Sequence, residues 1–132
     1  MFTQIKTSKE NKEIVAKLTR KLNLGTENII ARIAFSHSLS LDRKLSLNNL
    51  ADFGGKEYTR TVLFGEYEDI YVGLICVNYN IYKTDKDLAK YVKLHVDDGL
   101  RLLNDDMQQN ENIDGFDYLV EKVSTSIQYF SV

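Results

Sequence analysis

Histidine, serine and carboxylate side chains supply the few arrangements in this sequence that could support catalysis. His37 stands between Ser36 and Ser38, and His95 stands three residues before Asp98. A serine and a histidine can act as nucleophile and base, but neighbouring residues of a helix point in different directions, so adjacency alone does not pair them. An imidazole one turn from a carboxylate is typically a buried histidine held in orientation rather than a proton-transfer pair. We expect both histidines to be structural.

Paired carboxylates and the single cysteine are the other candidates for chemistry; the acidic pairs are Glu66/Asp69, Asp97/Asp98 and Asp105/Asp106. Nuclease carboxylates bind divalent ions in this way, but no histidine or lysine accompanies these pairs at nuclease-like spacing. Cys76 lies in an apolar run and is expected to pack as a small hydrophobe. Two histidines and one cysteine are too few ligands for a zinc site within one chain. The residues therefore predict no enzyme activity, no metal and no cofactor.

The net charge of −2 conceals a basic N-terminal region. Residues 1–44 contain nine Lys and Arg against four Asp and Glu, whereas residues 45–132 contain eight against fifteen. The total alone counts against nucleic acid as a partner, because nucleic-acid-binding domains are usually basic. The division indicates instead that a basic surface and an acidic C-terminal part coexist in one chain.

Seven basic residues are the candidates for contact with DNA phosphates: Lys9, Lys12, Lys17, Arg20, Lys21, Arg43 and Lys44. The first five fall on the polar side of a predicted helix, where Glu10 and Glu13 reduce their charge to about three net positive charges. A face of mixed charges that simply meets water is the alternative interpretation of such a segment.

The first five basic residues depend on a helix over residues 8–23. Apolar residues recur there at helical spacing, at Ile14, Val15, Leu18 and Leu22. Thr7 is expected to cap this helix, because Glu10 follows three residues on, as in a capping box. Gly25 is expected to take the left-handed conformation that ends it.

A second helix and an extended arm are expected to flank the first helix. Thr26 caps the second helix, which ends near residues 38–40 and has an inner face of Ile29, Ile30, Ile33, Ala34 and His37. Residues 2–7 alternate weakly and are expected to form a short strand or an extended arm.

The remainder of the chain is expected to contain two longer helices. Residues 41–65 are rich in turn formers and end in a stretch that is expected to be extended. Residues 67–82 carry apolar side chains at helical spacing, although their β-branched and aromatic residues leave a buried pair of strands as an alternative. A further helix runs from residue 84 to about Asp106. A polar connector and a tail follow, and the tail is expected to dock through Phe116, Tyr118, Leu119, Val120 and Val123.

Length and composition predict one mainly α, compact helical domain. The chain has 132 residues, 43% of them apolar, with no internal repeat and no linker. Its core is expected at about residues 8–103 and an acidic tail at residues 104–132. No run of roughly 18 apolar residues and no apolar leader occur, so a cytoplasmic location is the expectation.

Apolar surface that one chain cannot bury predicts association between copies. The segment 67–82 is apolar on several sides, and two adjacent glycines mark a flexible stretch before it. The residues expected at an oligomer interface are Gly54, Gly55, Tyr67, Ile70, Tyr71 and Leu74.

Three stretches of the sequence, taken in order, resemble one protein family. They are NLGTENIIARIAFSHSLSL, GGKEYTRTVLFGEYEDIYVGLI and DLAKYVKLHVDDGLRLL, and the match runs from about Ser8 to Leu103. Each piece is short, but three in this order and at these separations do not easily arise by chance. The sequence resembles the DndE family, the small subunit of bacterial DNA phosphorothioation systems.

The resemblance implies a compact, mainly helical protein that forms homo-oligomers, with a tetramer as the expected state. It implies a DNA-binding accessory subunit without sulfur chemistry of its own. Such a subunit binds duplex or nicked DNA through surface lysines, which correspond here to the basic residues of the first helix. The implied partners are the sulfur-transfer and ATPase subunits that replace a non-bridging phosphate oxygen of DNA by sulfur. The order of extended arm, helix, glycine turn and helix is also similar to a ribbon-helix-helix layout.

Three other functions compete with DNA binding by an accessory subunit. A protein–protein adaptor of the same complex would use the basic helix against an acidic partner and bind little DNA. A metal-dependent nuclease would need Asp97 and Asp98 as ligands. A stand-alone ribbon-helix-helix repressor would read bases through paired strands, for which only Gln4 and Lys6 are available here.

Overall fold

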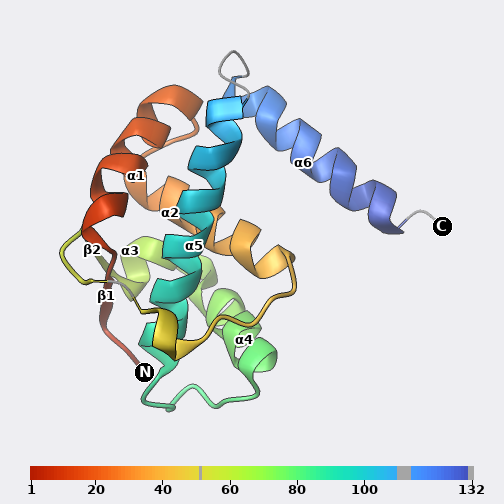
Figure 1. Cartoon of the computed structure of the whole chain (residues 1–132). Helices are drawn as coiled ribbons and strands as arrows, with labels where there is room; N and C mark the ends of the chain where they lie inside the picture. The colour runs from red at the N-terminus through yellow and green to blue at the C-terminus, as the bar shows by residue number, and fades with distance from the viewer. Residues whose placement is uncertain (51, 110–113, 131–132) are drawn as a thin grey trace.

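The computed structural model describes residues 1–50, 52–109 and 114–130, and the side chains of the last helix up to residue 124. The chain is mainly α, as predicted (Figure 1). Its helices are α1 (Lys9–Leu22), α2 (Glu27–Ser40), α3 (Arg60–Phe64), α4 (Glu68–Tyr79), α5 (Leu88–Gln109) and α6 (Gly115–Phe130). Two strands, β1 (Gln4–Lys6) and β2 (Glu57–Thr59), and two short 3₁₀ turns, η1 (Leu47–Asn49) and η2 (Gly65–Tyr67), complete the described elements.

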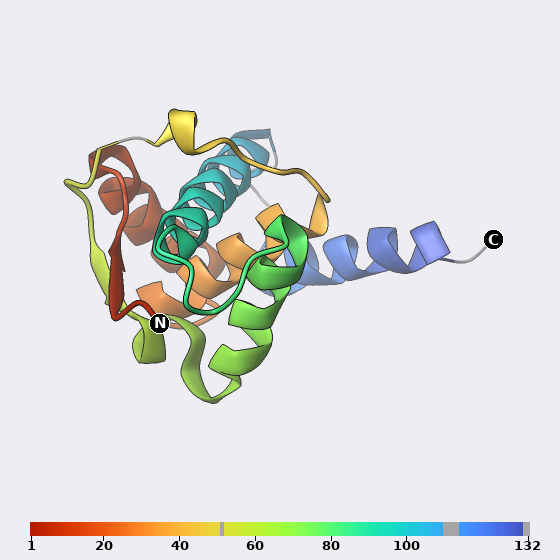
Figure 2. The same cartoon turned by 90° about the horizontal axis from the view of Figure 1, so that it is seen from below.

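The long helix α5 is the axis around which α1, α2 and α4 pack (Figures 1 and 2). α2 crosses α5 at Gly99, where an added Cβ would lie 1.9 Å from the carbonyl oxygen of Ala34. Only glycine lets the two backbones approach so closely. α1 runs beside α5 in the same direction, since Ser8 contacts Asp97 and Lys17 contacts Asn104. The predicted basic helix is therefore fixed along the central helix.

The N-terminal arm forms the predicted strand, and it pairs within the chain. β1 is antiparallel to β2, with Ile5 opposite Tyr58. Ile5 and Tyr58 are both buried, whereas their neighbours in each strand are exposed. The order of strand, helix, turn and helix is as expected. The backbone groups of β1 form their hydrogen bonds with β2 of the same chain.

The ends of α1 differ from the prediction. Ser8, not Thr7, is the N-cap residue, because the Thr7 hydroxyl is hydrogen-bonded to the backbone of Lys56. Asn23, with φ of 52°, takes the left-handed position after the helix that was predicted for Gly25. Asparagine tolerates this conformation because its short side chain bonds locally.

The inner face of α2 is rotated from its predicted position. The buried residues are Ile30, Ala31, Ala34, Phe35 and Ser38, while Ile29, Ile33 and His37 are only partly buried. The hydroxyl of Ser38 faces α5 because His95 and Asp98 of that helix are its polar partners. A count of apolar residues could not detect this rotation.

The C-terminal half confirms the helices and corrects their bounds. Residues 68–79 form a helix, not the alternative pair of strands. Arg60–Phe64 is helical where extended chain was predicted, because Thr59 caps a short helix by accepting from the N–H of Val62. α5 begins at Leu88 and extends to Gln109, so the start of the predicted connector is helical; residues 110–113 lie outside the described part. α4, with 12 residues, is not longer than α1.

The predicted tail forms α6, which leaves the helical body at the upper end of α5 (Figures 1 and 2). Tyr118 docks as expected and is buried, and Leu119 is partly buried. Phe116, Val120 and Val123 are exposed instead. In the part of the chain that the structure describes, no helix combines the length and apolarity that a membrane crossing requires.

Candidate nucleic-acid interface

The basic side chains of α1 lie on its exposed side, as predicted. We call them the α1 basic face: Lys9, Lys12, Lys17, Arg20 and Lys21. The helix buries Val15, Leu18 and Leu22 against the core. At about 100° per residue, the basic side chains spread over the opposite side. All of them are exposed except Lys21, which is partly buried. With 14 residues, α1 presents this face over about 21 Å.

Contacts with α5 divide the α1 basic face into two groups. Lys17 Nζ donates to Asn104 Oδ1 at 3.2 Å, and Lys21 Nζ donates to the carbonyl of Met107 at 3.3 Å. That carbonyl lies in the last turn of α5, where carbonyls lack helical partners and carry partial negative charge. Within the described residues, the side chains of Lys9, Lys12 and Arg20 have no hydrogen-bond or ion-pair partner. These three therefore point their full charge to solvent.

The N-terminus of α1 is closed by two carboxylates from elsewhere in the chain. Asp97 Oδ1 accepts from the Ser8 N–H at 3.1 Å and from Asn11 Nδ2 at 2.6 Å. Asp52 Oδ1 accepts from the Gly54 N–H at 2.9 Å and from the Lys9 N–H at 2.6 Å, and these donors hold the pKa of the Asp52 carboxyl below its usual value. A helix N-terminus can bind phosphate, but here protein carboxylates already occupy it. DNA contact by α1 would use side chains rather than the helix end.

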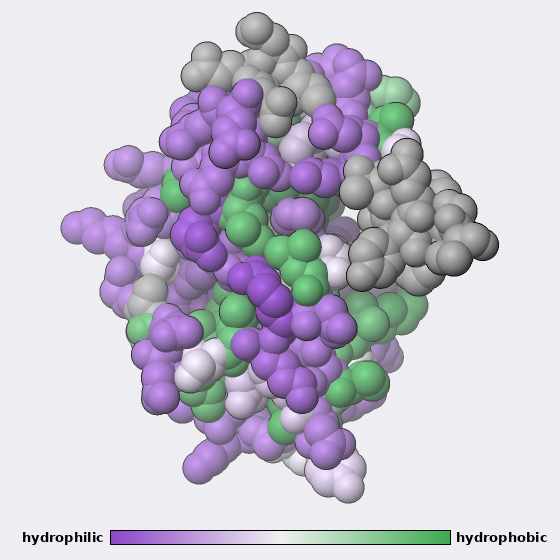
Figure 3. All heavy atoms as spheres, turned by 45° about the vertical axis from the view of Figure 1, so that its right-hand side comes forward, coloured by the Kyte–Doolittle hydropathy of each residue, from purple (hydrophilic) through white to green (hydrophobic). Residues whose placement is uncertain are grey.

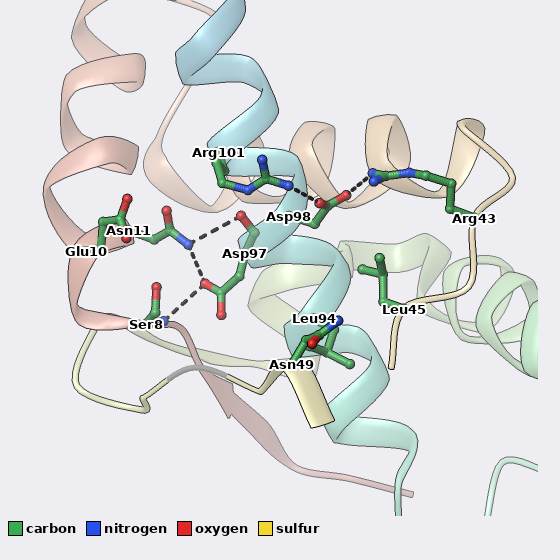
Figure 4. Close-up of a pocket in the computed structure, with 10 residues that line it drawn as sticks. All are labelled: Ser8, Glu10, Asn11, Arg43, Leu45, Asn49, Leu94, Asp97, Asp98 and Arg101. Atoms are coloured by element: carbon green, nitrogen blue, oxygen red, sulfur yellow. Dashed lines mark hydrogen bonds and ion pairs between the residues drawn. The ribbon is translucent and has the colours of Figure 1, made fainter. Parts of the chain in front are cut away.

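Arg43 and Arg101 share one carboxylate, that of Asp98 on α5 (Figure 4). Asp98 accepts from Arg43 through Oδ2 and from Arg101 through Oδ1, the latter at 2.6 Å. The carboxylate is nearly buried, whereas both arginines are partly exposed at a cavity of about 360 Å³. Glu10 lines the same cavity. The two guanidinium groups are balanced by the carboxylates of Asp98 and Glu10, so these four groups carry no net charge.

A buried chain of hydrogen bonds holds Asp98 and the loop that carries Arg43. An ionised carboxylate only accepts, so Ser38 Oγ donates to Asp98 Oδ2 at 2.7 Å and accepts from His95 Nδ1 at 2.8 Å. His95 Nε2 then accepts from the Tyr79 hydroxyl at 2.6 Å, which in turn accepts from the Leu45 N–H at 2.8 Å. The chain therefore fixes the loop at both Arg43 and Leu45.

His95 is neutral in this network. It is fully buried, and burial lowers its pKa to about 4. One ring nitrogen therefore donates and the other accepts, as the order of hydrogen bonds requires. The predicted structural role of the imidazole is confirmed, with the addition that Ser38 lies between it and Asp98.

The remaining predicted residues are not all brought to one surface. Lys44 is exposed on the loop after α2, and the guanidinium of Arg43 is paired with the carboxylate of Asp98. Tyr67, Ile70 and Leu74 are about half exposed or more. Tyr71 instead stacks on Phe64 in the core, with ring centroids 5.1 Å apart.

Close contacts within the chain explain why position 55 is a glycine. A Cβ there would lie 2.1 Å from the Ser8 carbonyl oxygen, and the Gly55 N–H donates to the Thr7 carbonyl at 2.9 Å. The neighbouring Gly54 is exposed, and its N–H donates to Asp52 Oδ1. Both glycines thus shape the loop that caps α1.

Arg101 is the basic residue that sequence reasoning missed. It lies in the acidic C-terminal half, where the charge balance hides it. Its position four residues after Asp97 and three before Asn104, both of which contact α1, places it on the α1 side of α5. That spacing is a signal in the sequence, but only once the α5 residues that contact α1 are known.

The acidic pair that a nuclease would need is already paired. Asp97 Oδ2 lies 2.6 Å from Nζ of the buried Lys93, and Asp98 binds two arginines. Among the described residues, no three His, Cys, Asp or Glu side chains lie together as ligands for a metal ion.

Comparison with known families assigns the fold that carries this surface. The family model described as DNA sulphur modification protein DndE matches residues 4–111. The chain belongs to the DndE family. A crystal structure of DndE from Escherichia coli B7A, described as involved in DNA phosphorothioation modification, has a TM-score of 0.63 and 24% identity. A DndE variant with two glycines replaced by lysine has a TM-score of 0.66 and 24% identity.

The two DndE structures share their fold with most of this chain. In each case the match covers 98% of the DndE chain and 78% of this chain. No curated protein matches the chain. Membership of the DndE family connects the chain with DNA phosphorothioation, and the family resemblance seen in the sequence is confirmed.

Proposed function

We propose that the chain is a non-catalytic accessory subunit of a DNA phosphorothioation system that binds the backbone of duplex or nicked DNA through the α1 basic face. The observation that carries the proposal is the exposure of Lys12 and Arg20 on one rigid helix, without a partner among the described residues. In a family connected with DNA phosphorothioation, exposed unpaired cations are available for contact with the anionic DNA backbone.

The arrangement of charge supports contact with phosphates rather than with bases. Lys9, Lys12 and Arg20 lie along the exposed side of α1, and Lys17 and Lys21 lie beside them, next to α5. Long flexible cations on a convex helix face suit phosphate oxygens, which carry no sequence information. We therefore expect little sequence preference.

The expected affinity of one copy is low. Each phosphate that a lysine or arginine neutralises releases counterions, so three to five contacts give a slope of log K against log salt of about −3 to −5. Several copies in a homo-oligomer, for which we propose a tetramer, would multiply these contacts through effective concentration. Oligomerisation is thus part of the proposed binding mechanism.

A salt titration tests the proposal. Fluorescence anisotropy of a labelled duplex, intact or nicked, is measured with the full chain at several salt concentrations, and the oligomer mass is determined in the same buffers. The proposal expects binding that weakens with the slope given above. Binding that is absent at low salt, or that is insensitive to salt, would contradict it.

The second candidate is a protein–protein adaptor of the same complex, which would join the sulfur-transfer and ATPase subunits. Lys17 and Lys21 favour it, because both already bind polar groups of a neighbouring helix. This function predicts no DNA binding near physiological salt, together with a stable complex that contains a partner subunit and is lost when the α1 basic face is reversed.

A further inference from the structure

α6 is an addition to the fold that the chain shares with DndE. The family model ends at residue 111, and the DndE structures match nearly their whole length while leaving about a fifth of this chain unmatched. α6 begins after that point, at Gly115. The helix therefore gives this chain a surface that the matched fold does not require.

The first turns of α6 are fastened to the body. A Cβ at Gly115 would lie 1.9 Å from the Leu22 carbonyl oxygen, so the helix starts in direct contact with the end of α1. Tyr118 is buried and its hydroxyl donates to Asp106 Oδ2 at 2.7 Å. Lys122 Nζ lies 3.0 Å from the same carboxylate. These contacts set the direction in which the rest of the helix leaves the body.

A groove of about 470 Å³ lies between α6 and the body. α2 supplies Ile29 and Ile33, α4 supplies Tyr71, and α6 supplies Leu119 and Val123. The polar residues at this groove include Arg32, His37 and Lys122. On the face seen in Figure 3, apolar groups form a broken band bordered by hydrophilic side chains. The groove separates α4 from α6 within one chain.

Each side of the groove continues into an exposed apolar face. On the α4 side this face consists of Tyr67, Ile70, Leu74 and Val77, the last 83% exposed. On the α6 side it consists of Phe116, Val120 and Val123, with Phe116 72% exposed. Both sets recur at three- and four-residue spacing, so each forms one stripe along its helix. Stripes of this kind on a folded domain mark an interaction surface.

We propose that the α4 stripe of a second copy of this chain packs against the α6 stripe at the edge of this groove, and that the contact is reciprocal. α4 and α6 lie on opposite sides of one groove, so a two-fold axis through it places α4 of each copy against α6 of the other. Such an isologous contact closes on itself and repeats every apolar pair twice. In this arrangement α6 of each copy holds the two subunits together.

Charge at the groove supports a copy of this chain as the occupant. Arg32 donates to the carbonyls of Leu63 and Val62, which are neutral acceptors, so its positive charge remains at the groove. The α4 stripe begins beside Glu66 and Asp69, which are both exposed; Asp69 is 80% exposed and its Oδ1 lies 3.9 Å from Lys83 Nζ. The acidic end of an incoming α4 is thus complementary to the basic group on α2.

The inference rests on the homo-oligomer part of the proposed function, and its tests are made without DNA. In the first, sedimentation equilibrium compares the full chain with Leu74→Glu, on α4, and Val123→Glu, on α6. We expect an even-numbered oligomer for the unaltered chain and a halved or monomeric mass for both variants, with unchanged far-UV circular dichroism. Val62→Glu is the matched control, because Val62 is similarly exposed but lies on α3.

A monomeric unaltered chain would overturn the inference, and so would an oligomer that survives Val123→Glu. In the second test, two chains in a Cys76→Ser background carry Leu74→Cys or Val123→Cys and are mixed under mild oxidation. A disulfide-linked dimer is expected in the mixture and not in either chain alone. Cross-linking of the Leu74→Cys chain to itself would place α4 against α4 and reject the α4–α6 pairing.

The two proposals fail separately. A chain that assembles through α4 and α6 but shows no salt-dependent binding to duplex DNA would refute the proposed DNA contact and keep this interface. A chain that binds DNA with the expected salt slope but sediments as a monomer would do the reverse.

Discussion

The hydroxyl of Ser38 lies 2.8 Å from Nδ1 of His95, although 57 residues separate them in the chain. The serine joins the imidazole to Asp98, and Asp98 binds the guanidinium groups of Arg43 and Arg101. A buried neutral histidine therefore determines where two surface arginines stand. These residues hold helices α2 and α5 together with the loop after α2.

Ser38→Ala should destabilise the protein by about 1–3 kcal/mol. The substitution leaves the His95 N–H buried without its acceptor and removes one of the two donors to Asp98 Oδ2, and an unmade buried hydrogen bond costs about this much. Urea unfolding followed by circular dichroism measures the difference. Ser36→Ala is the matched control, because Ser36 is exposed on the same helix, and its effect should stay within about 0.5 kcal/mol. Equal effects of both substitutions would contradict the assigned network.

Stability should fall as the pH drops from 6.5 toward 4. Burial lowers the pKa of His95 to about 4 in the folded state, whereas an unfolded histidine titrates near 6.5. At pH 7 both states are neutral; below pH 6.5 the unfolded state takes up the proton first, so folding loses about 2 kcal/mol by pH 5. Urea titrations at pH 7, 6 and 5 measure the slope.

The second histidine supplies the control for this pH dependence. Partial burial also lowers the pKa of His37, so it adds to the loss in the same direction. His37→Gln should retain most of the slope between pH 7 and 5, whereas His95→Gln should remove most of it. A slope that disappears with His37→Gln would show that His95 is not the group responsible.

Reversal of two unpartnered cations of the α1 basic face should weaken DNA binding strongly. Lys12→Glu with Arg20→Glu should raise the Kd for a duplex about ten-fold or more and reduce the salt slope by about two, since each lost phosphate contact removes about one. Lys83→Glu with Lys86→Glu changes the net charge equally on the loop before α5 and serves as the control. Anisotropy at two salt concentrations separates the outcomes; equal weakening by both pairs would indicate a general charge effect.

Gly99→Ala should destabilise the fold by about 3 kcal/mol. The added methyl would meet the Ala34 carbonyl oxygen at 1.9 Å, so α2 and α5 must move apart. Gly73→Ala, in the helix α4 where no atom lies within 4 Å of the new methyl, should instead stabilise by about 0.5–1 kcal/mol. Thermal unfolding of both variants compares them, and a tolerated Gly99→Ala would contradict the close crossing of the two helices.

Periodicity and capping predicted the helices of this protein well but placed their ends less well. The apolar residues of α1 recur at a spacing that only a helix buries together, so its basic face was also predicted. The N-cap moved from Thr7 to Ser8 because the Thr7 hydroxyl bonds to Lys56, which is remote in sequence. The extended stretch predicted before residue 65 contains α3, because Thr59 provides a local cap.

The sequence alone determined the helical class, the family and the exposed basic side of α1, because local spacing and residue type control these properties. Only the tertiary structure decided which charges remain free. It paired Arg43 with Asp98, bound Lys21 to a backbone carbonyl of α5, and placed Arg101 on the α1 side of α5. It also left α4 and α6 with apolar faces on opposite sides of one groove. The physical reason is that neighbouring groups decide whether a surface charge stays unpaired and whether an apolar side chain stays exposed. Those neighbours come from distant parts of the chain.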